Sequence, residues 1–186
     1  MKALLVIDVQ NGIVNYGDFK DNNNPVIFMR HLDDAEESSL YKHSVGSELH
    51  SSLKDYADCV LEKQTPSSFF NTELSNILAK LGVNHLFITG FNTEFCCMFT
   101  AISAFDRGYK VTFIENATGT VNTDETYEMQ GLDIKDFVGT VLHSTTTFSR
   151  LLQPAKAANP IVIAPSRIRR LLRLLQYANA QFLHQA

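Results

Sequence analysis

The 186-residue sequence lacks several features that define specialised protein classes. No apolar run approaches the roughly 20 residues needed to cross a bilayer, and the first run ends at Asp8, too early for a secretion signal. The three cysteines include the adjacent pair Cys96 and Cys97, a poor basis for a disulfide framework. The net charge of −4 argues against general nucleic-acid binding. We therefore expect a cytoplasmic protein with no membrane span and no nucleic-acid partner.

Sequence motifs for cofactors and metals are also missing. No Gly-x-Gly-x-x-Gly follows the first apolar run, and there is no P-loop. His43 and His50 belong to no metal-ligand pattern. We expect neither a nucleotide cofactor nor a catalytic metal.

Short apolar runs alternate with helical patterns along most of the chain. The runs predict strands buried on both faces, as in a parallel sheet; they cover residues 4–7, 26–29, 59–61, 86–89, 111–114 and 137–142. Helical patterns over residues 71–81 and 96–107 stop at Gly82 and Gly108. The sequence predicts an α/β fold with a Rossmann-like, doubly wound, mainly parallel sheet flanked by helices in three layers. Active groups should lie at the carboxyl ends of the strands.

The chain divides into a main domain, residues 1–150, and a C-terminal extension, residues 151–186. The extension carries basic residues and no Asp or Glu. Residues 166–177 have the spacing of an amphipathic helix that packs on the same domain or on a second subunit. A membrane surface or an acidic partner is the alternative. The link from Asp8 to Pro25 is close to the shortest crossover that joins two parallel strands.

Residues 90–96 place Cys96 between the end of a strand and the start of a helix. The helix N-terminus favours a thiolate, and its backbone N–H groups can hold an oxyanion. These properties suit a nucleophile, although a cysteine after a strand is also commonly a small buried apolar residue. Cys97 points about 100° away along the helix and should be such a buried residue.

Asp8 and Lys63 each end an apolar run in the same way. Taken singly, Asp8 could cap a turn and Lys63 could be a solvated lysine. Together with Cys96 they place three reactive groups at one rim of the predicted sheet. A carboxylate there could take the thiol proton, while an ammonium would lower the pKa of the thiol and hold the carboxylate in place.

These segments resemble the isochorismatase-like cysteine hydrolases. Residues 3–12 (ALLVIDVQNG) are similar to the opening of that family, and residues 62–70 (EKQTPSSFF) to its lysine segment. Residues 90–96 (GFNTEFC), followed by Thr100 and by residues 106–111 (DRGYKV), are similar to its nucleophile turn. The resemblance runs from Lys2 to about His143.

The resemblance implies a Cys96, Asp8 and Lys63 triad that hydrolyses an amide-like C–N bond of a small molecule through a thioester. It also implies a cis peptide between Phe91 and Asn92, and an oxyanion hole formed by the backbone N–H groups of Asn92 and Cys96.

Substrate contacts and assembly follow from the same resemblance. Gln10, Phe69 and Phe95 would line the substrate site, although the two phenylalanines could equally be core residues. Nicotinamidase-type relatives carry a metal-binding Asp-x-His where this chain reads MRHLD at residues 29–33, which supports the expectation of no metal. A homodimer or larger assembly is expected.

Two departures from the family pattern leave other readings open. The chain has little room for a helix between the first two predicted strands, and its ending after His143 is unlike that of the family. A catalytically weak member acting as an assembly or binding module is therefore the main alternative. A receiver-type signalling domain would need an acceptor Asp where Lys63 stands, and isochorismate vinyl-ether hydrolysis would not need the cysteine.

Overall fold

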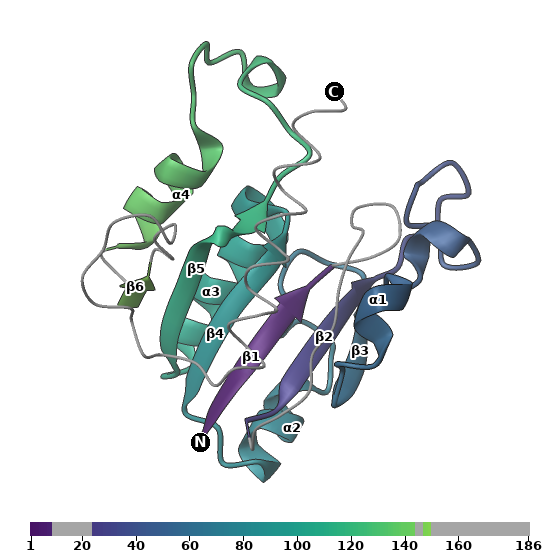
Figure 1. The fold of residues 1–186 in the computed structure, drawn as a ribbon, viewed down its shortest axis with the longest axis vertical. Helices are drawn as coiled ribbons and strands as arrows, with labels where there is room; N and C mark the ends of the chain where they lie inside the picture. Colours follow the sequence, from purple (N-terminus) through teal and green to yellow (C-terminus); the bar gives the residue numbers. More distant parts are fainter. Residues whose placement is uncertain (9–23, 144–146, 150–186) are drawn as a thin grey trace.

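The fold is seen in a computed structural model that describes residues 1–8, 24–143 and 147–149 (Figure 1). Its centre is a six-stranded sheet in the order β3-β2-β1-β4-β5-β6, and all neighbouring strands are parallel. The chain builds outward from β1 in one direction and from β4 in the other. This confirms the doubly wound α/β class, and it places the topological switch point, where such folds bind ligands, between β1 and β4.

The first five strands begin close to their predicted positions, and the sixth was not predicted. They are β1 (Lys2–Ile7), β2 (Val26–His31), β3 (Cys59–Lys63), β4 (His85–Phe91), β5 (Lys110–Gly119) and β6 (Thr147–Ser149). At the carboxyl end of β1, Ile7 pairs with Gly90 of β4. A Cβ atom at Gly90 would collide with the backbone of Ile7, so the two strands can lie this close only because residue 90 is glycine.

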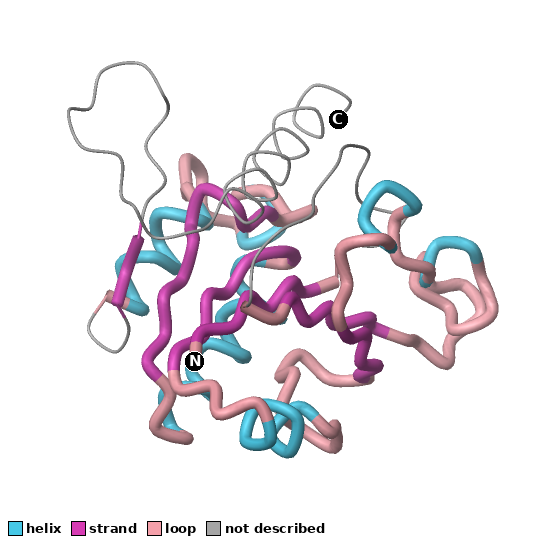
Figure 2. Tube along the Cα trace, turned by 60° about the horizontal axis from the view of Figure 1, so that its bottom comes forward, coloured by secondary structure: helices cyan, strands magenta, loops and turns pink. Residues whose placement is uncertain are grey.

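Three helices cover one face of the sheet, and a short helix lies against the other. The helical segments are η1 (Val45–Ser47), α1 (Ser51–Lys54), α2 (Leu74–Lys80), the π-helical η2 (Thr93–Cys97), α3 (Met98–Asp106), η3 (Glu125–Tyr127) and α4 (Ile134–Leu142). Side chains of α2, α3 and α4, among them Leu78, Ala101 and Val138, form one buried cluster with Leu5 and Ile88 of the sheet. In Figure 1, α1 lies in front of the sheet and α3 behind it; Figure 2 shows the same elements in a turned view.

The strand predicted over residues 137–142 is wrong, because this segment belongs to α4. The Asp133 carboxylate accepts hydrogen bonds from the backbone N–H groups of Lys135 and Asp136 and caps the helix. Ile134, Val138 and Leu142 are buried at a spacing of four residues, which is a helical period. Residues 147–149 form the last strand instead.

The two predicted helices are present with shifted starts. The first begins at Leu74 rather than at residue 71, because the Thr72 hydroxyl donates to the Ser68 carbonyl and closes a turn before the helix. The second begins after the π-helical turn that contains Cys96. Gly82 and Gly108 follow the two helices with positive φ angles, as the predicted helix ends require.

Several predictions fall outside the described residues. They are Gln10 and most of the short link after Asp8, and the helix expected over residues 166–177 in the C-terminal extension. Within the described ranges, no helix has both the length and the apolar character needed to cross a membrane.

Candidate active site at the carboxyl edge of the sheet

The structure brings Asp8, Lys63 and Cys96 together at the switch point of the sheet. Asp8 follows β1, Lys63 is the last residue of β3, and Cys96 lies in the turn after β4. The Lys63 Nζ atom lies 2.7 Å from Oδ2 of Asp8 and 3.2 Å from Sγ of Cys96. The Asp8 and Lys63 side chains are almost fully buried, so their ion pair lies in a region of low dielectric constant.

The Asp8 backbone is held in an unusual conformation. Its φ angle is 51°, in the left-handed region that non-glycine residues rarely adopt, and its N–H donates to the Met29 carbonyl at 3.0 Å. One carboxylate oxygen, Oδ2, accepts from Lys63. The other, Oδ1, is buried without a hydrogen-bond partner among the described residues. Asp8 therefore has one oxygen that is held and one that is available.

The nucleophile turn connects β4 to α3. The peptide bond between Phe91 and Asn92 is cis, and residues Thr93–Cys97 form a π-helical turn. The Asn92 carbonyl accepts from the N–H groups of Phe95 and Cys97, which closes the turn. Cys96 is partly exposed, whereas Cys97 is fully buried in the core.

Hydrogen bonds fasten this turn and the lysine segment to the rest of the fold. The Thr100 hydroxyl of α3 accepts from the N–H of Ser68 and donates to the Ser68 hydroxyl, both at 3.0 Å. The buried Glu94 uses one carboxylate oxygen to accept from Thr120, Asn122 and Tyr127. The loop after β5 is thereby tied to the residue two positions before Cys96.

The protonation of Cys96 differs from the sequence-based expectation. Burial and the negative charge of Asp8 raise the pKa of the Cys96 thiol to about 12, and Lys63 only partly opposes this rise. The expected thiolate is therefore not the resting form at neutral pH. The thiol must lose its proton during a reaction, and a carboxylate oxygen of Asp8 lies within 4.8 Å of the sulfur.

Lys63 is the positive centre of this cluster. Burial is the largest single influence and lowers the pKa of its ammonium, but the charge of Asp8 and the hydrogen bonds to Asp8 and Cys96 together outweigh burial, and the net shift is upward. A negative charge on Cys96, once the thiol has lost its proton, acts in the same upward direction. His31 also contacts the ammonium, with Nδ1 at 3.1 Å from Nζ. Sequence reasoning missed this contact, because the segment around His31 was considered only for metal binding; its position at the end of β2 was the available signal.

Asp8, His31 and Cys96 carry donor atoms of the kind that bind metals, and these atoms lie within 4.8 Å of one another. All three side chains lie within hydrogen-bonding distance of the Lys63 ammonium. A positive charge therefore already lies where a cation would bind, and we assign these donors to the ammonium.

The predicted substrate residues have different surroundings. Phe69 is buried in the core against Tyr109 and Arg107, which agrees with the alternative that it is a core residue. Phe95, beside Cys96, is 41% exposed. The neighbouring Phe70, which sequence reasoning did not single out, lines a cavity of about 350 Å³ together with Lys63. The sequence could not show which of two adjacent phenylalanines faces this cavity.

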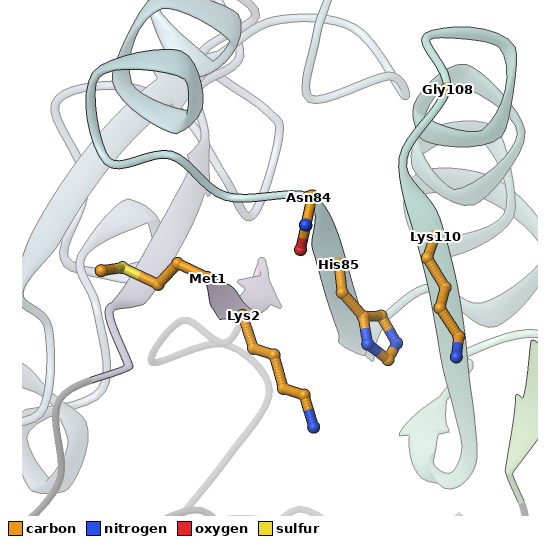
Figure 3. A pocket seen from close by; sticks show the side chains of 6 residues that line it. All are labelled: Met1, Lys2, Asn84, His85, Gly108 and Lys110. Carbon is orange, nitrogen blue, oxygen red and sulfur yellow. The ribbon is translucent and has the colours of Figure 1, made fainter.

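A second cavity, of about 440 Å³, lies at the opposite edge of the sheet (Figure 3). Lys2, His85 and Lys110 line it from the first residues of β1, β4 and β5, which are paired with one another. The candidate active site is at the other ends of these strands, so this cavity does not belong to it.

Comparison with known proteins identifies a family that has this fold. Residues 17–146 match the isochorismatase domain. The chain belongs to the isochorismatase family. The match spans most of the described residues and includes the segments that carry Lys63 and Cys96.

The chain is similar in sequence to an uncharacterized isochorismatase family protein and to two amidohydrolases. The chain is 29% identical over 139 residues to the uncharacterized isochorismatase family protein YddQ of Bacillus subtilis, an alignment that covers 63% of this chain and 77% of that protein. It is 40% identical over 67 residues to nicotinamidase 3 of Arabidopsis thaliana, covering 36% of this chain and 34% of the relative. It is 33% identical over 98 residues to the ureidoacrylate amidohydrolase RutB of Yersinia enterocolitica, covering 53% and 42%. The chain thus spans less than half of each amidohydrolase relative.

Solved structures of an isochorismatase-like hydrolase and of a nicotinamidase share the fold. An isochorismatase-like hydrolase from Alkaliphilus metalliredigens has a TM-score of 0.66 at 19% identity, covering 80% of this chain and 94% of that one. The nicotinamidase SaPncA from Staphylococcus aureus has a TM-score of 0.58 at 17% identity, covering 82% and 98%.

Proposed function

We propose that this isochorismatase family member is a cysteine hydrolase that cleaves an amide-like C–N bond of a small molecule through a thioester. Family membership and the nicotinamidase and ureidoacrylate amidohydrolase relatives support a hydrolase that acts on C–N bonds. The observation that carries the mechanism is the arrangement of Asp8. Lys63 holds one of its carboxylate oxygens, and the other has no partner among the described residues.

In the first half of the proposed reaction, Cys96 Sγ attacks the substrate carbonyl carbon while Asp8 accepts the thiol proton. The raised pKa of the thiol requires such a base, because little thiolate exists before substrate binds. The developing oxyanion is proposed to accept from the backbone N–H groups of Asn92 and Cys96. As the C–N bond breaks, Asp8 gives its proton to the leaving nitrogen, and the acyl group remains on sulfur as a thioester.

In the second half, Asp8 takes a proton from a water molecule that attacks the thioester carbon. The C–S bond breaks, the proton returns to sulfur, and a carboxylic acid leaves. Throughout, the ammonium of Lys63 stays close to both reacting groups and stabilises negative charge on either of them. The cavity lined by Lys63 and Phe70 is proposed to hold part of a small substrate whose carbonyl reaches Cys96. Phe95, which does not line this cavity, is proposed to contact the substrate beside Cys96.

Ammonia release from nicotinamide, ureidoacrylate and related small amides would test this function. We expect turnover of at least one such amide, and intact-protein mass spectrometry should detect an acyl adduct on Cys96 during turnover. Cys96→Ala should lose both signals, while Cys97→Ala should keep them. A folded protein that gives neither ammonia nor an adduct across the series would instead support a catalytically weak binding module.

A further inference from the structure

The Lys63 ammonium has a neighbour outside the proposed triad, the imidazole of His31. These two residues are register partners at the ends of β2 and β3. Nζ lies 3.1 Å from the His31 Nδ1 atom and 3.2 Å from the Thr65 carbonyl oxygen, in addition to its contacts with Asp8 and Cys96. The three N–H groups of the ammonium therefore face four acceptors, which come from different segments of the chain.

This contact defines the state of the imidazole. An ammonium group can only donate hydrogen bonds, so a hydrogen bond between Lys63 and His31 requires a neutral ring that accepts at Nδ1 and carries its proton on Nε2. Burial and the Lys63 charge hold the pKa of His31 below its usual 6.5, while the charges of Asp8 and Asp33 partly offset them. The direction of this shift agrees with the neutral ring that the hydrogen bond requires.

We propose that His31 is a positioning residue that keeps the Lys63 ammonium between Asp8 and Cys96, and that it does so only while neutral. This inference rests on the proposed function. Protonation would place an N–H group opposite the ammonium, so the hydrogen bond would be lost and two like charges would face each other. It would also turn His31 into a donor that competes for the Asp8 carboxylate, which lies within 4.8 Å.

The proposal predicts the acid side of the pH–activity profile. Among the described residues, the charges that shift the pKa of His31 are those of Lys63, Asp8 and Asp33, and Cys96 lies beyond the ammonium. Because the neutral ring is the working form, activity should be present above the pKa of His31 and lost as the pH falls through it. That loss should occur below pH 6.5, the usual value for histidine.

Three variants separate the hydrogen bond from the titration when kcat/KM for the best amide substrate is measured between about pH 4.5 and 8.5. His31→Gln should keep most of the activity near neutral pH and move the acid limb to lower pH, because its amide oxygen can accept from Lys63 and does not titrate. His31→Ala should lose about 10- to 100-fold in kcat/KM, the range expected for a lost hydrogen bond to a charged group. His50→Gln is the matched control, since burial also lowers the pKa of His50; its profile should equal that of the wild type. The proposal would be overturned if the acid limb of His31→Gln lay at the same pH as that of the wild type, or if His31→Ala kept the wild-type kcat/KM.

An NMR titration of the His31 ring tests the contact without any turnover. Its pKa should lie below 6.5 in the wild type, rise in Lys63→Met and fall further in Asp8→Asn, because Lys63 lowers it and Asp8 raises it. Absence of amide hydrolysis together with these shifts would refute the proposed function while leaving the His31–Lys63 contact intact. A His31 pKa that is the same in all three folded proteins would refute the contact itself.

Discussion

Asp8 and Lys63 form a buried ion pair between the carboxyl ends of β1 and β3. Their contact is 2.7 Å, and their side chains are 5% and 0% exposed. Removing one member of such a pair leaves an uncompensated charge and typically costs about 3–5 kcal/mol. Substitutions at either residue therefore change stability as well as chemistry, and each activity measurement needs a melting curve beside it.

Cys96→Ala should abolish amide hydrolysis and leave the fold intact. The sulfur forms the covalent bond to substrate in the proposed mechanism, and losing a nucleophile typically lowers kcat by about 10³-fold or more. Cys97→Ala is the matched control, because this fully buried cysteine packs in the core. It should lower the melting temperature slightly and keep most of the activity. Equal loss of activity in the two variants would show that the nucleophile is misassigned.

Asp8→Asn and Lys63→Met should change the alkylation of Cys96 in opposite directions. The charge of Asp8 raises the pKa of the thiol and the charge of Lys63 lowers it. At mildly alkaline pH, Asp8→Asn should therefore react faster than the parent with iodoacetamide, although hydrolysis is lost, and Lys63→Met should react more slowly. Mass spectrometry in a Cys59→Ser background would follow the reaction. Slower alkylation in Asp8→Asn would contradict the electrostatic coupling.

His85 should make the protein less stable in mild acid. Burial is the main cause that lowers the pKa of His85 to about 4, followed by the charges of Lys110 and Lys2. Between pH 6.5 and about 4 the unfolded chain binds a proton that the folded protein does not, so stability falls as pH falls through this window.

Melting temperatures at several pH values would test this effect. His85→Gln should show a smaller decrease between pH 6.5 and 4 than the wild type. Lys110→Met should also show a smaller decrease, because it removes a charge that opposes protonation of His85. If the melting temperatures of all three proteins fell equally with pH, His85 would be ruled out as the source of the lost stability.

The outward face of η2, α3 and α4 should bind a second copy of this chain. Phe95, Phe99, Ile102, Phe105, Phe137 and Val141 are 39% to 54% exposed on these adjoining segments. The four phenylalanines alone expose about 400 Å² of apolar surface. One side of a standard interface buries about 800 Å², of which somewhat more than half is apolar, so this face matches what a dimer needs.

Light scattering on the full chain would test this assembly. The wild type should have twice the 20.9 kDa chain mass, and Phe99→Glu should have the mass of one chain with an unchanged far-UV spectrum. Val45→Glu is the control, because Val45 is exposed in η1, outside this face. A wild type of single-chain mass, or a Phe99→Glu dimer, would exclude the proposed dimer face.

The sequence by itself predicted the fold class and the reactive groups that meet at one edge of the sheet. Apolar runs without alternation predict strands buried on both faces, and β1, β2, β4 and β5 are buried in this way. The same prediction is wrong for β3, which lies at the edge of the sheet and exposes Val60. Parallel strands have their carboxyl ends on one side, so Asp8, Lys63 and Cys96 could be expected there before any coordinates. The strand predicted at residues 137–142 was wrong, because the periodicity of a short apolar run does not distinguish a strand from a helix.

The tertiary structure decided what each residue contacts and how it is charged. Burial and the charge of Asp8 raise the pKa of the Cys96 thiol, although the Lys63 ammonium opposes them. The register between β2 and β3 brings His31 to Lys63, and packing assigns Phe69 to the core and Phe70 to the cavity. These properties depend on distances between residues far apart in the chain, and a pattern along the chain reports only local preference.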